Sequence, residues 1–105
     1  MDNLEKSFHK DMLDIYRCAE KELGYRATRF LQMVSEKGGV STAINLVSKP
    51  GGTEGFAFLW EHKRLDLSVE KLVLKEKYIS LFSNEVRQLS RERLLEYGYS
   101  VVEES

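Results

Sequence analysis

Apolar residues recur at spacings of three and four along much of the chain, which places them on one face of an α-helix. The first stretch predicts an amphipathic helix over residues 4–23, and Gly24 follows it, where a helix end favours glycine. A second helix is predicted from about Ala27 to the Gly38-Gly39 pair. Each helix has an apolar face to cover, so the pattern predicts helices packed round one core.

Hydroxyl side chains mark the starts of later helices, because they accept hydrogen bonds from the free amides of a first helical turn. Ser41 is the candidate N-cap of a short helix to about Ser48, and Thr53 that of a helix ending near Lys63. Pro50 separates these helices, since proline lacks an amide hydrogen and disfavours helical geometry at the preceding residue. The segment around it is therefore predicted to be a loop.

Ser68 and Ser83 are candidate N-caps for two further helices, the last of which ends at Gly98. Between them, residues 72–82 are rich in Val, Ile, Tyr and Phe, so a strand or hairpin is the alternative there. No Asn-Gly or Asp-Gly turn supports that alternative. The pattern predicts an all-α fold: a compact single domain of five to six short helices with an amphipathic N-terminal helix.

Composition agrees with one globular domain, because 105 residues with 42% hydrophobic and 31% charged content match that class. Sixteen Lys and Arg against seventeen Asp and Glu give a net charge of −1, so binding to nucleic acid would need a local patch. The lone Cys18 predicts a reduced intracellular thiol, and the N-terminus lacks a signal-peptide pattern. We therefore expect a cytoplasmic protein. No apolar run approaches the roughly 20 residues of a membrane helix, so no membrane role is expected.

Three segments carry a resemblance: YRATRFLQMVSEKGGVSTAINLV, GFAFLWEHKRLDLSVEKLVL and YISLFSNEVRQLSRERLLEYGY. Together they resemble a small, largely uncharacterised bacterial domain, of the kind met alone or near restriction and mobile-element genes. Its most distinctive pieces here are Gly38-Gly39, Gly55-Phe56, Leu65-Asp66-Leu67 with Glu70, and Arg93-Leu94 with Gly98-Tyr99. The resemblance implies a bacterial, intracellular setting connected with DNA transactions or defence, and it implies no activity.

The first helix, within residues 1–24, lies outside this resemblance, which covers a helical core domain of residues 25–99; a frayed tail is expected at residues 100–105. Two roles are open for the first helix, a core element or a docking arm, and its apolar face would also suit a homodimer. As a docking arm it would offer three side chains to a protein partner: Phe8, Met12 and Tyr16. Met33 and Tyr25 would be further adaptable contacts if exposed.

Catalytic and metal-binding patterns are not found. His9 and His62 are the only histidines, and neither belongs to a metal-binding or nucleophile motif. Arg93 lies on the inner edge of the last helix, where an ion pair with a carboxylate such as Asp66 or Glu70 is expected. We therefore expect no enzyme, no cofactor and no metal.

Two features favour nucleic-acid binding as an alternative. Residues 27–48 form helix, turn and helix, as in a helix-turn-helix, but the second helix contains no cation to reach DNA, so a core helical hairpin is the competing interpretation. Five cations would form a patch for nucleic acid or another anion if the fold brought them together: Arg26, Arg29, Lys49, Lys63 and Arg64. Otherwise they solvate separate surfaces.

The sequence thus predicts a non-enzymatic helical interaction module that binds a protein partner, in the bacterial defence or mobile-element context that the resemblance implies. The alternative is a small nucleic-acid-associated protein that uses the basic patch and a degenerate helix-turn-helix.

Overall fold

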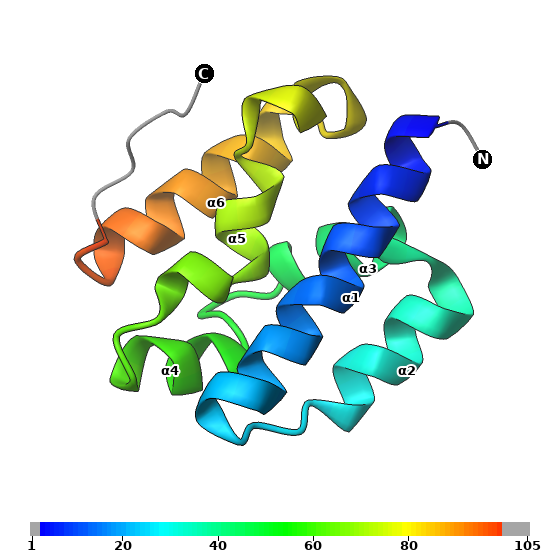
Figure 1. Ribbon diagram of the computed structural model, residues 1–105. Coiled ribbons are helices and arrows are strands. Elements are labelled where there is room, and N and C mark those ends of the chain that lie inside the picture. The colour runs from blue at the N-terminus through cyan, green and yellow to red at the C-terminus, as the bar shows by residue number, and fades with distance from the viewer. Residues whose placement is uncertain (1–2, 100–105) are drawn as a thin grey trace.

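The longest helix, α1 (Asn3–Leu23), runs diagonally across the front of the molecule in Figure 1, and α2 and α3 pack against it. The computed structural model describes residues 3–99. After α1 follow α2 (Thr28–Lys37), α3 (Gly39–Val47), α4 (Glu54–Glu61), the 3-10 helix η1 (Leu65–Leu67), α5 (Val69–Val73), the 3-10 helix η2 (Glu76–Leu81) and α6 (Asn84–Glu96). No strand occurs within the described range, so the all-α prediction is confirmed.

Residues 72–82, for which a strand was the alternative, are largely helical. They contain the end of α5 and all of η2. Their β-favouring side chains serve the core instead: Tyr78 is fully buried, and its ring meets that of Phe8 edge to face, with centroids 5.0 Å apart. Tertiary packing therefore decides the conformation of a segment whose local preference is ambiguous.

Side-chain caps begin three helices where the sequence predicts them. Thr53, Ser68 and Ser83 each accept a hydrogen bond from the backbone amide three residues later, at 3.2 Å. At the ends of α1 and α6, Gly24 and Gly98 have φ angles of +66° and +80°. Glycine adopts such angles without a steric penalty, so these predicted boundaries are confirmed.

The start of α3 differs from the prediction, because the helix begins at Gly39 rather than after Ser41. Gly38, with a φ of +87°, turns the chain between α2 and α3 within one residue. The first amide of α3 is capped from another helix, since the Gly39 amide donates to His9 Nδ1 over 3.1 Å. A tertiary contact thus replaces the serine cap that the local sequence predicts.

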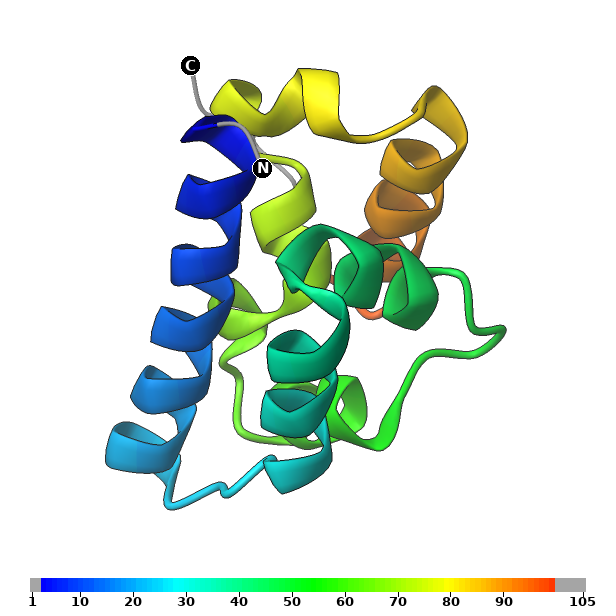
Figure 2. The ribbon, with the colours of Figure 1, turned by 90° about the vertical axis from the view of Figure 1, so that its right-hand side faces the viewer.

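The core consists of two clusters of buried apolar side chains. The larger cluster contains Phe8, Met12, Val34, Ala43, Val47, Val69, Leu72, Val73, Tyr78, Phe82 and Val86. The smaller cluster contains Phe56, Leu59, Leu65, Leu74 and Leu94. Figure 2 shows α3 in the middle of the molecule, between α1 on one side and α6 on the other.

α1 is a core element rather than a docking arm. Phe8 and Met12, which the sequence predicts as partner contacts, have 0% of their surface exposed. The Phe8 ring packs edge-on against Tyr78 and Phe82, with centroids 5.0 Å away in both cases. This packing corrects the prediction, because neither side chain can reach a partner while the protein is folded. Of the three predicted contacts, only Tyr16 is partly exposed.

None of the helices between residues 3 and 99 combines the length and apolar character that crossing a bilayer requires. The tail that the sequence predicts to fray, residues 100–105, lies outside the described residues.

Candidate functional site

An open groove of about 460 Å³ lies where the two core clusters meet. Its lining includes Val69 of the larger cluster and Phe56 and Leu59 of the smaller one. The rest of the lining comes from the second half of α1, the turn before α2, α2 as far as Met33, the end of α3, the loop after it, the start of α4 and the segment 67–70. Its volume is typical of sites that receive a small molecule or a few side chains. We call it the seam groove.

The wall of the seam groove formed by α1 and α2 is apolar and partly exposed. Tyr16 comes from α1, and Phe30 and Met33 come from α2. An apolar group placed in the groove would remove more of this surface from water, which is favourable. Tyr16, Met33 and Tyr25, which the sequence predicts as contact residues, therefore share one site.

Three of the five predicted cations also line the seam groove. Arg26 comes from the turn before α2, Arg29 from the first turn of α2, and Lys49 from the loop after α3. Arg26 and Lys49 are separated in the sequence by α2 and α3, and the packing of these two helices against each other brings both cations to one groove.

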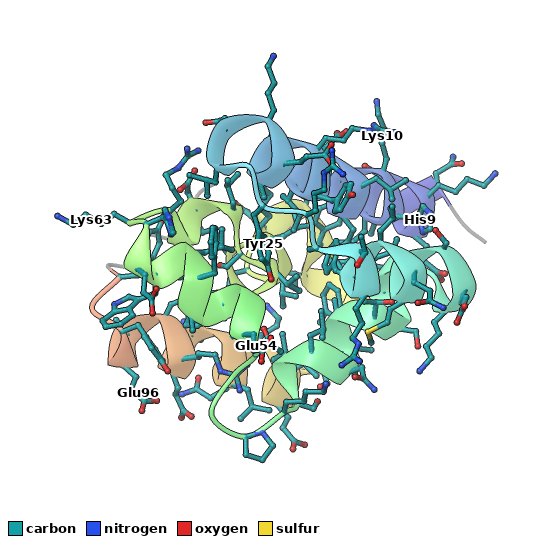
Figure 3. All side chains as sticks on the ribbon, turned by 90° about the horizontal axis from the view of Figure 1, so that it is seen from below. His9, Lys10, Tyr25, Glu54, Lys63 and Glu96 are labelled. Atoms are coloured by element: carbon teal, nitrogen blue, oxygen red, sulfur yellow. The ribbon has the colours of Figure 1, made fainter. Side chains whose placement is uncertain are left out.

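The other two predicted cations do not belong to the groove lining. Lys63 is exposed beyond the end of α4, and its side chain extends away from the molecule in Figure 3. Arg64 forms ion pairs with Glu22 at 2.7 Å and with Asp66 at 3.1 Å. Hydrogen bonds to Asp66 and Glu22 raise the pKa of the Arg64 guanidinium. The five cations therefore do not form the single patch that the sequence left open.

Charge balance differs among the groove cations. Arg26 lies 3.6 Å from Glu20, a loose ion pair between exposed side chains. Arg29 and Lys49 form no ion pair with any residue of the described range. Both therefore keep their charge available to a ligand in the groove.

Tyr25 lies beside the N-terminus of α4, and Figure 3 shows it near Glu54 in the centre of the view. Its ring stacks on Phe58, with centroids 4.2 Å apart and an interplanar angle of 16°. A Cβ on Gly55 would lie 3.5 Å from its hydroxyl oxygen. Burial and, second, the charge of Glu54 raise the pKa of the Tyr25 phenol. The hydroxyl stays protonated at neutral pH, and no residue between 3 and 99 accepts its hydrogen bond.

A buried ion pair between α5 and α6 borders the groove through its α5 member. Glu70 lines the groove with 3% of its surface exposed, and its Oε2 accepts a hydrogen bond from Arg93 Nη1 over 2.8 Å. Arg93 also donates to the carbonyl of Lys49, which ties the loop after α3 to α6. Burial raises the pKa of the Glu70 carboxyl, and the Arg93 guanidinium opposes that change. The expected ion pair of Arg93 is thus found with Glu70, while Asp66 pairs with Arg64.

α3, which would read DNA in a helix-turn-helix, lies inside the molecule. It packs against α1, α2, α5 and α6, and Thr42, Ala43 and Val47 are fully buried. Its exposed positions are uncharged: Ser41, Ile44 and Asn45. The α2–α3 pair is therefore a core helical hairpin, as the competing interpretation predicts.

Both histidines contact backbone polar groups. His9 caps α3 through Gly39, and His62 Nδ1 lies 2.9 Å from the carbonyl oxygen of Phe58. Cys18 is partly buried. Among residues 3–99, no three His, Cys, Asp or Glu side chains are grouped as metal ligands.

Sequence reasoning missed the groove itself. Phe30, Leu46 and Val69 line it, yet their helical spacing marks them only as core positions. The sequence feature that could have indicated the groove is a set of apolar side chains with a hydroxyl or thioether group close to cations in the chain: Tyr16, Tyr25 and Met33.

Compared with models of protein families, with curated proteins and with solved structures, the chain has no match. The resemblance to a bacterial domain therefore rests on its three sequence segments alone. The structure supports the coarser statement that the chain is a compact all-helical domain.

Proposed function

We propose that this protein is a non-enzymatic interaction module that binds a protein partner through the seam groove. The observation that carries the proposal is the partly exposed apolar wall of Tyr16, Phe30 and Met33 beside the unpaired cations Arg29 and Lys49. Protein interfaces are enriched in aromatic residues, Met and Arg, and methionine adapts its shape to an incoming side chain. The groove offers this combination on one continuous lining.

The setting in bacterial defence or mobile-element systems is part of the proposal and draws only on the resemblance of the three sequence segments. A nucleic-acid-associated role has less support, because binding to phosphates needs several cations on one surface. Here Lys63 and Arg64 lie outside the groove, and Arg64 is already paired.

A library of displayed random peptides selected against the intact protein tests the proposal. We expect selected peptides to shift the backbone amide resonances of the groove lining, and Met33→Glu to abolish their binding. Ile79→Glu is the control, because Ile79 is an apolar residue with 45% of its surface exposed and lies on η2 outside the groove. Thermal unfolding followed by circular dichroism checks that both variants fold.

The proposal is wrong if the selected peptides bind Met33→Glu as tightly as the unchanged protein, or if no peptide is selected. Sedimentation velocity addresses the homodimer. If the chain dimerises and Met33→Glu dissociates the dimer, the groove binds a second copy rather than a different protein.

A further inference from the structure

Two helices begin at the seam groove, and their starts differ in charge. α4 has a side-chain cap, Thr53, and its first residue is Glu54, which offsets the positive end of the helix dipole. α2 has no side-chain cap and no acidic residue in its first turn. Its start carries Arg29 instead, so the cation and the helix dipole have the same sign there.

The lining of the groove also contains Lys49, from the loop after α3. Neither Lys49 nor Arg29 meets a carboxylate in the described part of the chain, and the nearby Arg26 is only loosely paired, at 3.6 Å, with Glu20. The Glu70 carboxylate, which also lines the groove, is neutralised by Arg93 at 2.8 Å. Glu54 is the other carboxylate of the lining, so the three cations outnumber the two carboxylates and the groove has surplus positive charge, although the whole chain has a net charge of −1.

Apolar and hydrogen-bonding groups lie within the same lining. Phe30 and Met33 follow Arg29 along α2, so the apolar wall begins next to this cation. The Tyr25 hydroxyl is an additional donor whose ring is held by stacking on Phe58. A ligand that matches these groups has an apolar part flanked by negatively charged groups that accept hydrogen bonds.

We propose that the seam groove recognises an acidic segment of its partner protein, in which a leucine or phenylalanine enters the groove and neighbouring aspartates or glutamates pair with Arg29 and Lys49. This inference rests on the proposed function, because it names the chemistry of the partner at the same site. The apolar side chain supplies most of the affinity, and the charges select the partner and speed its association.

The composition of the peptides selected from the random library is the first test. We expect enrichment of Asp and Glu beside Leu or Phe. Fluorescence anisotropy with the best selected peptide should then show binding weaker by more than about tenfold for the double variant Arg29→Glu/Lys49→Glu, because it loses two exposed charge pairs and places like charges opposite the acidic peptide. Selection repeated on the double variant should enrich Lys and Arg instead.

Lys63→Glu is the matched control, because Lys63 is exposed but does not line the groove, and it should leave binding unchanged. Arg29→Gln/Lys49→Gln removes the charges without reversing them and should give an intermediate loss. Both cations are exposed, so these variants keep the core intact, which thermal unfolding verifies.

Failure of this inference differs from failure of the proposed function. Groove-binding peptides that are neutral or basic would overturn the acidic partner while the interaction module stands. Absence of any peptide in the groove would overturn both. A labelled 20-nucleotide DNA or RNA that binds at low salt, displaces the peptide and is released by Arg29→Glu/Lys49→Glu would assign the cations to phosphate instead.

Discussion

The guanidinium of Arg93 and the carboxylate of Glu70 form a buried ion pair, with Nη1 and Oε2 separated by 2.8 Å and the side chains 9% and 4% exposed. Glu70 belongs to the first turn of α5 and Arg93 to α6. Arg93 also donates to the carbonyl of Lys49, in the loop after α3. One side chain therefore joins three segments, of which α5 and the loop after α3 line the seam groove.

Arg93→Met should lower the free energy of unfolding by about 3–5 kcal/mol, because it leaves the Glu70 carboxylate buried without a partner. Urea denaturation measures this loss. The double variant Arg93→Met/Glu70→Leu is the control, since it removes both charges, and it should recover most of the stability. Equal losses in the single and double variants would show that the ion pair itself matters little.

The loss in Arg93→Met should also depend on pH. Burial already raises the pKa of Glu70, and without Arg93 nothing opposes that change. A carboxyl whose pKa is higher in the folded than in the unfolded state contributes stability at low pH and loses it as the pH rises through the folded pKa. Arg93→Met should therefore be closer to the unchanged protein at pH 4 than at pH 7, as urea titrations at both values would show.

Gly39→Ala should destabilise the protein by about 1–3 kcal/mol, because overpacking a close contact forces the backbone to shift. A Cβ at position 39 would lie 2.8 Å from the His9 Cα, and α1 cannot move without disturbing the core. Gly55→Ala is the matched control: its Cβ would meet Tyr25 at 3.5 Å, an ordinary contact. Because alanine favours helix, the control should gain about 0.5–1 kcal/mol. A neutral Gly39→Ala would mean that α1 and α3 are not packed this closely.

Thr42→Val should stabilise the protein by up to about 1 kcal/mol. The Thr42 Oγ1 is buried with no hydrogen-bond partner, and an unpaired buried hydroxyl is unfavourable. The same substitution at Thr53 is the control with the opposite sign, because there the hydroxyl caps α4 and its removal costs about 1 kcal/mol. Differential scanning calorimetry should show the melting temperature rising for the first variant and falling for the second.

Tyr78→Phe should lower stability at pH 7 by about 1–2 kcal/mol, because it removes the hydrogen bond from the hydroxyl to Asp11 and the contact with Ser7 at 3.0 Å. The substitution should also reduce the decrease in the free energy of unfolding that occurs at alkaline pH. Burial and then the hydrogen bond to Asp11 raise the pKa of Tyr78.

The stability that comes from the neutral phenol of Tyr78 is therefore complete below about pH 10 and is lost as the pH rises through the higher folded pKa. Chemical denaturation between pH 8 and pH 11.5 should show a smaller decline for Tyr78→Phe than for the unchanged protein. Tyr16→Phe, whose hydroxyl has no hydrogen bond to the described residues, is the control. Parallel declines in all three proteins would contradict the role of Tyr78.

Local features of the sequence determined most helix boundaries. Thr53, Ser68 and Ser83 each cap a helix by accepting a hydrogen bond from the amide three residues later. Gly24 and Gly98 adopt the positive φ angles at which α1 and α6 end. These effects act between neighbours in the chain, so the pattern of residue types is enough to predict them. The all-α class follows from the same local signals together with the helical spacing of apolar residues.

Long-range contacts decided the rest. Phe8 and Met12 are core residues because they share one buried cluster with Tyr78 and Phe82, about seventy residues away, whereas the sequence shows only that all of them are apolar. The start of α3 depends on His9 in another helix.

The candidate site shows the same division. The sequence identified Arg29 and Lys49 as cations, and Tyr16 and Met33 as adaptable apolar groups. Only the tertiary structure placed them on one groove and removed Arg64 from it by pairing that residue with Glu22, 42 positions away. Charge and hydrophobicity belong to single residues, whereas a binding surface depends on distances between residues that only the packing of helices determines.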